Sequence, residues 1–315
     1  MTRKAPGRSD RAVTVIKLFQ MFPDEATSRK WLENNRWPNG ERHCPHCGSL
    51  KTSTVLNERP MPYHCGECRQ YFSVKTGTVM QSSKVALQKW VIAMYLMSRS
   101  LKGVSSMQFY RDLGLTQKTA WLLAQKVRQG WIDGGGNLAG KVEVDETYIG
   151  GKERNKHGDE RLKGGRGAVE KAAVIGAKER NGKVRASVIA KTKTASLDGF
   201  VRENVEPGAT VFTDEHSGYR HFFASFTHRS VRHGVGEYVN GMAHTNGIES
   251  FWAMLKRGYK GTYHKMSAKH LSRYVVEFAG RHNFRDLDTL AQMTMLAKGL
   301  DGKRLRYNDL VADHG

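Results

Sequence analysis

Four cysteines stand in two close pairs in the first quarter of the sequence. Cys44 and Cys47 form one C-x-x-C pair, Cys65 and Cys68 form the other, and 17 residues lie between the pairs. Two such pairs can wrap a tetrahedral Zn²⁺, because the thiolates of each pair span one edge of the tetrahedron. A site closed by four protein ligands keeps no position for water or substrate. We therefore expect one structural zinc ion per chain.

A second set of residues that could do chemistry is acidic. Asp145 lies in a segment that alternates apolar and polar residues, Asp214 ends a short apolar segment, and Glu249 lies on a predicted helix. Three such carboxylates can hold two Mg²⁺ or Mn²⁺ ions about 4 Å apart, the arrangement with which nucleases activate water and stabilise a leaving 3′ oxygen. The pattern predicts a metal-dependent nuclease site.

Two residues are candidates for the third member of this acidic site. Asn246 and Glu249 stand one helical turn apart, and Lys256 shares their face of the helix. A carboxylate offers a hard cation a charge and two oxygens, whereas an amide offers one neutral oxygen. Charge therefore favours Glu249 over Asn246.

The composition points to a polyanionic partner. Lysine and arginine number 51 against 30 aspartate and glutamate residues, which gives a net charge of +21. Double-stranded DNA is the partner that we expect, with a merely solvated basic surface as the alternative. The basic residues expected to contact DNA are Lys118, Lys126, Arg128, Lys152, Arg154, Lys163, Arg166, Arg257, Lys260 and His264.

The elements that must position these residues fall into five segments. A glycine-rich break at 133–136 marks the main boundary. We expect an N-terminal helical segment at 1–40, a zinc ribbon at 41–80, a helical, helix-turn-helix-like DNA-binding segment at 81–135, a catalytic domain at 136–290 with a basic insertion at 150–170, and a C-terminal tail at 291–315.

The helix-turn-helix interpretation depends on a short turn. Gly114 suits a tight turn and Thr116 suits the cap of the helix that follows, but a plain helical connector fits the same pattern. Beyond the boundary, strand patterns at 142–149, 172–178, 184–191 and 209–213 and helical patterns at 195–203, 247–257 and 267–282 predict a mixed sheet flanked by helices.

The sequence contains no signal for a membrane. The first ten residues are basic and polar, and the longest apolar run, at 90–97, is far shorter than the roughly 20 residues that a span needs. We expect a cytoplasmic protein. In a reducing compartment the cysteines are metal ligands rather than disulfides.

Several motifs around these residues occur together in one known family. Asp145 is followed by Glu-Thr-Tyr-Ile-Gly-Gly, Asp214 precedes Gly218-Tyr219, and Glu249 lies in His-Thr-Asn-Gly-Ile-Glu-Ser-Phe-Trp at 244–252. A Trp-Pro-Asn-Gly sequence at 37–40 precedes the first cysteine pair. In this order, and over nearly the whole chain, the motifs resemble bacterial insertion-sequence transposases of the ISXO2-like type.

The resemblance implies an α+β multidomain protein with a zinc ribbon and an RNase H-like catalytic domain. It implies that Asp145 and Asp214 are the first two acids of a Mg²⁺-binding triad, that Glu249 or Asn246 is the third, and that Lys256 contacts DNA near the cleaved phosphate. It further implies strand cleavage and strand transfer at the terminal inverted repeats of an element and into target DNA, by a homo-oligomer near the bacterial nucleoid.

Two other functions fit part of the pattern. A zinc-ribbon regulator, or an inactive transposase-derived DNA-binding protein, would explain the charge and the cysteines without needing the three acids. A nuclease of the same fold could break strands without joining them.

Overall fold

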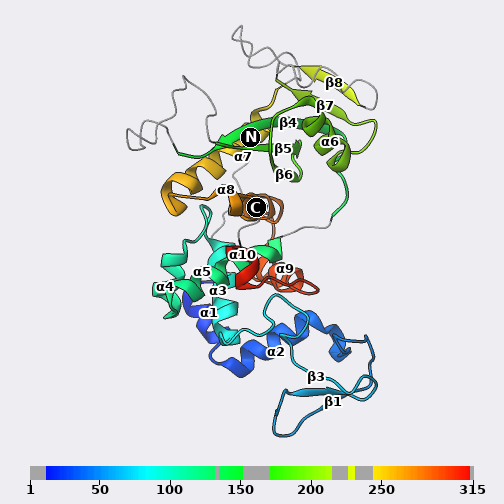
Figure 1. The fold of residues 1–315 in the computed structure, drawn as a ribbon, viewed down its shortest axis with the longest axis vertical. Coiled ribbons are helices and arrows are strands. Elements are labelled where there is room, and N and C mark those ends of the chain that lie inside the picture. Colours follow the sequence, from blue (N-terminus) through cyan, green and yellow to red (C-terminus); the bar gives the residue numbers. More distant parts are fainter. Residues whose placement is uncertain (1–11, 132–134, 152–170, 215–225, 231–243, 313–315) are drawn as a thin grey trace, which may run out of the picture. The chain divides into compact units, whose positions relative to one another are not determined.

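A five-stranded mixed sheet organises residues 133–285 in the computed structural model, which describes residues 12–131, 135–151, 171–214, 226–230 and 244–312 (Figure 1). The strand order is β6-β5-β4-β7-β8, with β4, β5 and β6 antiparallel, β7 parallel to β4, and β8 parallel to β7. The bounds are β4 (Lys141–Ile149), β5 (Ala172–Glu179), β6 (Val184–Ile189), β7 (Thr210–Thr213) and β8 (Thr227–Ser230).

Four of these strands were predicted from the sequence, whereas β8 was not. The β5–β6 hairpin turns at Asn181, whose φ of 61° is the left-handed conformation that an Asn-Gly turn supplies. The strand β8 is short and largely exposed, with the sequence Thr-His-Arg-Ser, so it carries no apolar alternation that would reveal it.

Helices cover both faces of the sheet. On one face α6 (Thr194–Asn204) packs against β5 and β6, and its Leu197 and Val201 share one core with Val142 and Val144 of β4. On the other face, α7 (Asn246–Gly258) and α8 (Ala268–Asn283) form a second core. Because side chains alternate along β4, the residues between its buried valines must face α7.

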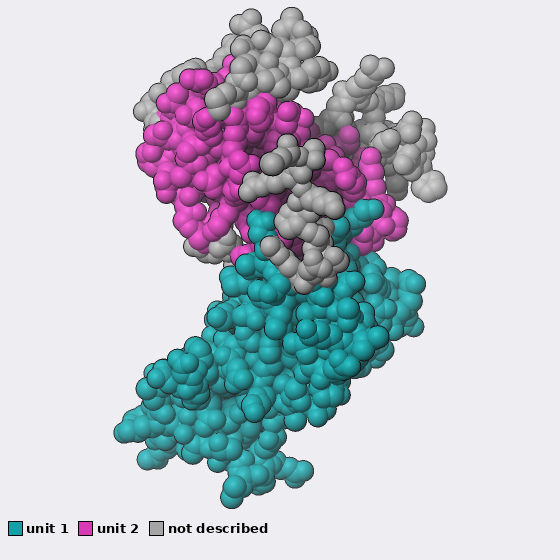
Figure 2. All heavy atoms as spheres, turned by 180° about the vertical axis from the view of Figure 1, so that it is seen from behind, with its two compact units in different colours: residues 1–132, 286–315 teal, residues 133–285 magenta. Residues whose placement is uncertain are grey.

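The rest of the chain forms a second compact unit. Unit 1 contains residues 1–132 and 286–315, and unit 2 contains residues 133–285 (Figure 2). The helix α3 (Leu87–Arg99) is the centre of unit 1, with Trp90 and Met94 fully buried. The other α-helices of this unit are α1 (Val15–Met21), α2 (Glu25–Arg36), α4 (Ser106–Leu113), α5 (Gln117–Arg128), α9 (Thr289–Gly299) and α10 (Tyr307–Val311).

The C-terminal region predicted as a tail requires correction. Most of it is helical, because α9 continues to Gly299 and α10 follows. Met293 and Leu296 on α9 and Leu310 on α10 are buried, and α9 packs against α2 and α3. These apolar side chains bring α9 and α10 back into unit 1, where they complete its core.

The predicted turn between two helices is present. Gly114 ends α4 with a φ of 56°, and the hydroxyl of Thr116 accepts a hydrogen bond from the backbone N–H of Thr119 at 3.3 Å at the start of α5.

The zinc ribbon is a three-stranded antiparallel sheet of β1 (Thr52–Thr54), β2 (Tyr63–Cys65) and β3 (Tyr71–Phe72). Among the described residues, no helix is both long enough and apolar enough to cross a membrane.

Candidate functional site

The four cysteines converge in the zinc ribbon. Their sulfur atoms all lie within 4.8 Å of one another, with Cys44 Sγ 3.6 Å from Cys68 Sγ and Cys47 Sγ 3.7 Å from Cys65 Sγ. Four sulfurs that each lie about 2.3 Å from a tetrahedral zinc are roughly 3.8 Å apart. The donor set and the spacing therefore both fit a structural Zn²⁺.

Asp145 and Asp214 come from neighbouring parallel strands. The ladder between β4 and β7 pairs Val142 with Val211 and Glu143 with Phe212. Asp214 directly follows β7, and continuing this register two residues beyond the last ladder pair would bring it level with Asp145. Its charge acts on the carboxyl of Asp145, so the two are near one another. Adjacent strands lie about 4.8 Å apart, so two carboxylates at this level are close enough to share a cation.

The third group comes from the first turn of α7. Glu249 is exposed there, and its Oε1 accepts the hydroxyl of Thr245 at 3.0 Å. Asn246 is also exposed and begins the helix, while Lys256 lies exposed in the last turn. All three predicted residues thus reach solvent from the helix that crosses the face of β4.

The acids influence one another electrostatically. Burial, and after it the negative charge of Glu146, raises the pKa of Asp145 to about 7. The charges of Asp214 and Glu249 act in the same direction. Among the described residues, however, only the cysteines bring three or more ligand atoms within 4.8 Å of one another. Three carboxylates repel one another at such distances unless a cation lies between them.

The helix α7 is attached to β4 by a contact to Asp145. The indole Nε1 of Trp252 donates a hydrogen bond to Asp145 Oδ2 at 3.0 Å. The ring lies over β5, where a side-chain carbon on Gly176 would come within 2.7 Å of it. Gly176 pairs with Asp145 in the β4–β5 ladder, so the missing side chain leaves the space that the indole occupies. No role in the site was predicted for this tryptophan from the sequence.

Sequence reasoning missed Glu143, whose carboxylate is 1% exposed on the same face of β4 as Asp145. It accepts the backbone N–H of Ile248 through Oε2 at 3.0 Å and the Nε of Arg180 through Oε1 at 3.1 Å. Nδ1 of His244 lies 3.3 Å from Oε1. The alternation of side chains along the strand could have identified Glu143, because residues two apart on a strand lie on the same face and Glu143 stands two residues before Asp145.

Two of the residues predicted to contact DNA are buried. Lys126 is 8% exposed and Arg128 is 2% exposed, and burial lowers the pKa of Lys126. Both lie in the last turns of α5, the half of the helix that packs into unit 1, so the prediction of a DNA contact is corrected for them.

The other predicted DNA contacts are either exposed or lie outside the described residues. Lys118 is exposed at the start of α5, with its Nζ 4.1 Å from the ring centre of Tyr307. Arg257, Lys260 and His264 are exposed at the end of α7 and just beyond it. The candidates that lie outside the described residues are Lys152, Arg154, Lys163 and Arg166.

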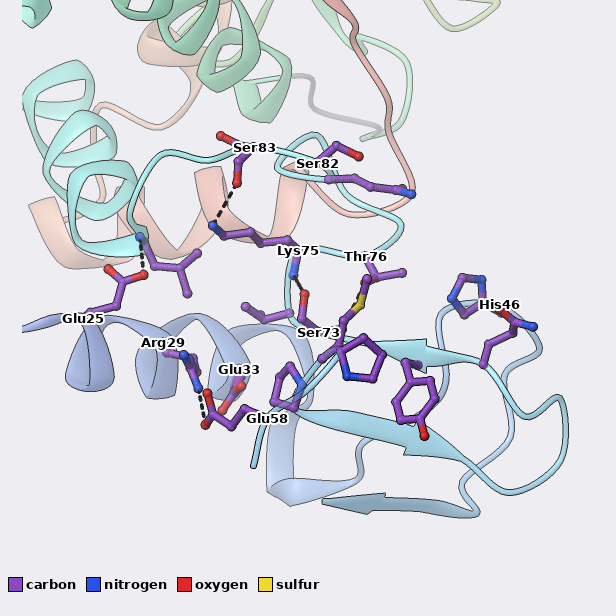
Figure 3. A pocket seen from close by; sticks show the side chains of 18 residues that line it. Glu25, Arg29, Glu33, His46, Glu58, Ser73, Lys75, Thr76, Ser82 and Ser83 are labelled. Atoms are coloured by element: carbon purple, nitrogen blue, oxygen red, sulfur yellow. Dashed lines mark hydrogen bonds and ion pairs between the residues drawn. The ribbon is translucent and has the colours of Figure 1, made fainter. Parts of the chain in front are cut away.

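A cavity of about 550 Å³ lies between α2 and the zinc ribbon (Figure 3). The charged side chains in its wall are engaged with the protein itself. Arg29 forms an ion pair with Glu58 at 2.7 Å, Lys75 donates to the carbonyl oxygen of Ser83 at 3.1 Å, and Glu25 accepts the backbone N–H of Leu87 at 2.8 Å. These contacts join the ribbon and α2 to the start of α3, so the charged side chains of this cavity stabilise the fold.

Comparisons with known proteins agree with the two units. A family model described as the ISXO2-like transposase domain matches residues 137–283, and one described as the transposase zinc-ribbon domain matches residues 23–71. An uncharacterized protein in transposable element ISH50 of Halobacterium salinarum is 31% identical over 295 residues, which cover 90% of this chain and 99% of that protein. An uncharacterized transposase-like protein of Haemophilus influenzae is 27% identical over 119 residues, which cover 37% of this chain and 95% of that protein.

Proposed function

Since this chain belongs to the ISXO2-like transposases, we propose that unit 2 cleaves DNA strands at the ends of an insertion sequence and joins them to target DNA, in a reaction that depends on Mg²⁺ or Mn²⁺. The observation that carries this proposal is that Asp145, on β4, and Asp214, which directly follows the neighbouring parallel strand β7, lie near enough for the charge of Asp214 to raise the pKa of Asp145. Glu249 is close enough to raise the pKa of Asp145.

The proposed reaction is an in-line displacement at phosphorus. In the first step a water oxygen forms a bond to phosphorus, the bond from phosphorus to the 3′ oxygen breaks, and that oxygen leaves as a 3′ hydroxyl. In the second step the oxygen of this hydroxyl forms a bond to a phosphorus of the target strand, and the bond from that phosphorus to the target's own 3′ oxygen breaks. The proton of the attacking hydroxyl is balanced by the one that the leaving oxygen takes up as a new 3′ hydroxyl. Two divalent ions would supply the positive charge that both oxygens need.

The residues of the chain have separate tasks in this scheme. Asp145, Asp214 and Glu249 would hold the cations, with Asn246 beside them as a further oxygen ligand or phosphate contact. Trp252 orients one carboxylate through its hydrogen bond to Asp145 Oδ2. Such outer contacts fix the direction of a metal ligand.

DNA would be held by exposed basic residues and by unit 1. Lys256, together with Arg257, Lys260 and His264, would neutralise phosphates near the acids, and Lys118 would do so from α5. In unit 1, the zinc ribbon and the α4–α5 pair are the proposed DNA-binding elements. A homo-oligomer would bring two element ends together.

The direct test is cleavage of DNA that carries the ends of the element. Wild-type protein should cut it with Mg²⁺, whereas Asp145→Asn and Asp214→Asn should bind the same DNA without cutting. Asp198→Asn is a matched control, because Asp198 lies on α6 and pairs with Arg202 at 2.7 Å. Cleavage that survives in both acid variants would contradict the assignment. Binding without cleavage by the wild type would favour the regulator instead.

A further inference from the structure

We propose that Glu143 is a positioning residue for the catalytic site, an inference that rests on the proposed function. Its buried carboxylate caps the helix α7 from the sheet and leaves Thr245 available to orient Glu249. Glu249 is the triad residue that lies in the first turn of α7, so its direction depends on how this helix start is held.

The N-terminal cap of α7 comes from a distant residue and not from the residue that precedes the helix. Thr245 precedes α7 and is a residue type that normally caps a helix, but its hydroxyl makes no capping hydrogen bond. Instead, the N–H of Ile248, the third residue of the helix, donates to Glu143 Oε2 at 3.0 Å. This is the N–H that a capping side chain ordinarily satisfies. Glu143 stands 105 positions earlier in the chain.

Releasing Thr245 from capping has a consequence for the site. Its hydroxyl donates to Glu249 Oε1 at 3.0 Å, so it holds one oxygen of the proposed metal ligand. The sheet residue therefore caps the backbone, and the local residue orients the carboxylate.

The carboxylate of Glu143 is itself fixed from several directions. Arg180 donates to it through Nε at 3.1 Å and donates through Nη2 to the carbonyl oxygen of His244 at 3.0 Å. Arg180 thus binds both Glu143, which caps the helix, and His244, which precedes Thr245. The guanidinium also lies 4.1 Å from the ring centre of Phe212 on β7, the strand that leads to Asp214.

Gly247 shows that the contact constrains the sequence of α7. A side-chain carbon at this position would lie 2.6 Å from Glu143 Oε2 and 2.9 Å from Lys178 Nζ. Glycine is a poor helix former, costing about 1 kcal/mol relative to alanine. Its presence in the first turn leaves the space through which Glu143 reaches the helix.

The test compares Glu143→Gln and Glu143→Ala with Val144→Ala in the full-length, zinc-loaded protein. Val144 is the neighbour of Glu143 on β4, equally buried but on the α6 face, so its truncation weakens the same unit without touching α7. The first measurement is amide hydrogen exchange of the first turn of α7. The second is the Mg²⁺ concentration at half-maximal cleavage.

Glu143→Ala should raise exchange of the first turn by at least about fivefold, the effect of losing a cap. Glu143→Gln should raise it in the same direction but less, because its single amide oxygen can accept from only one of Ile248 and Arg180. Both variants should also raise the half-maximal Mg²⁺ concentration or lower the cleavage rate by about 10- to 100-fold, as for other residues that orient metal ligands. Val144→Ala should do neither, even where its Tm falls as far. Gly247→Ala should reproduce the Glu143 phenotype although alanine favours helix.

Equal behaviour of the Glu143 variants and Val144→Ala in both measurements would overturn the inference, because Glu143 would then only stabilise the fold. Faster exchange with unchanged Mg²⁺ dependence and rate would overturn it too, since the cap would not orient the site. Failure of the wild type to cleave DNA would instead refute the proposed function, and with it any catalytic role for Glu143. Exchange alone would then still report whether the cap exists.

Discussion

Replacing Asp145 by asparagine should stabilise the metal-free protein at neutral and alkaline pH. The pKa of this carboxyl is raised from 3.8 to about 7 in the folded chain, chiefly because burial disfavours its charged form. The folded state therefore retains a proton that the unfolded chain has lost. Stability linked to this group is fully present below the unfolded pKa and is lost as the pH rises through the folded pKa.

The magnitude follows from the difference between the two pKa values. A difference of about 3, at about 1.36 kcal/mol for each pH unit, gives an upper limit near 4 kcal/mol above pH 7. Partial solvent contact of Asp145 reduces this figure. Between pH 5 and pH 8 the stability advantage of Asp145→Asn should grow by about 2 to 3 kcal/mol, or roughly 4 to 12 °C in Tm for a unit of this size.

The assay is scanning calorimetry of the full chain at both pH values, in buffer without Mg²⁺ and without a chelator that would remove zinc. Asp198→Asn is the control, since it makes the same chemical change in an acid whose partner is Arg202. It should lower the stability of unit 2 by at most about 1 kcal/mol. Adding Mg²⁺ at pH 8 should stabilise the wild type but not Asp145→Asn. An advantage for Asp145→Asn that is absent, or equal at pH 5 and pH 8, would refute this reasoning.

Four other expectations can be checked directly. Cys65→Ser should reduce zinc content by atomic emission from about one ion per chain to near zero, and a full equivalent retained would exclude Cys65 as a ligand. Glu249→Gln should abolish Mg²⁺-dependent cleavage while Asn246→Ala keeps part of it, and the reverse order would make Asn246 the third ligand. Gly176→Ala should lower the free energy of unfolding of unit 2, measured in urea, by about 1 to 3 kcal/mol, because the added carbon meets the Trp252 ring at 2.7 Å. An undiminished value would show that the indole is not confined. Affinity for DNA, measured by fluorescence anisotropy, should fall steeply with salt, and a flat dependence would argue against phosphate neutralisation.

Features that depend on short-range spacing could be predicted from the sequence. The two cysteine pairs lie within 25 residues of one another, so their spacing sufficed to predict the four-sulfur cluster that the structure contains. The Asn181-Gly182 hairpin and the Gly114 turn follow from local backbone preferences. The order of motifs along the chain likewise identified the family without any coordinates.

The contacts between distant segments could not be predicted in this way and became known from the fold. Periodicity shows that one side of an element is apolar, but it does not identify the segment that covers that side. The C-terminal helices join unit 1 for this reason, and the same limit let Lys126 appear available to DNA although it is buried. The contact between Glu143 and Ile248 spans 105 positions and depends on α7 lying across β4. Pairing between segments this far apart is set by the packing of the whole unit, which no local pattern encodes.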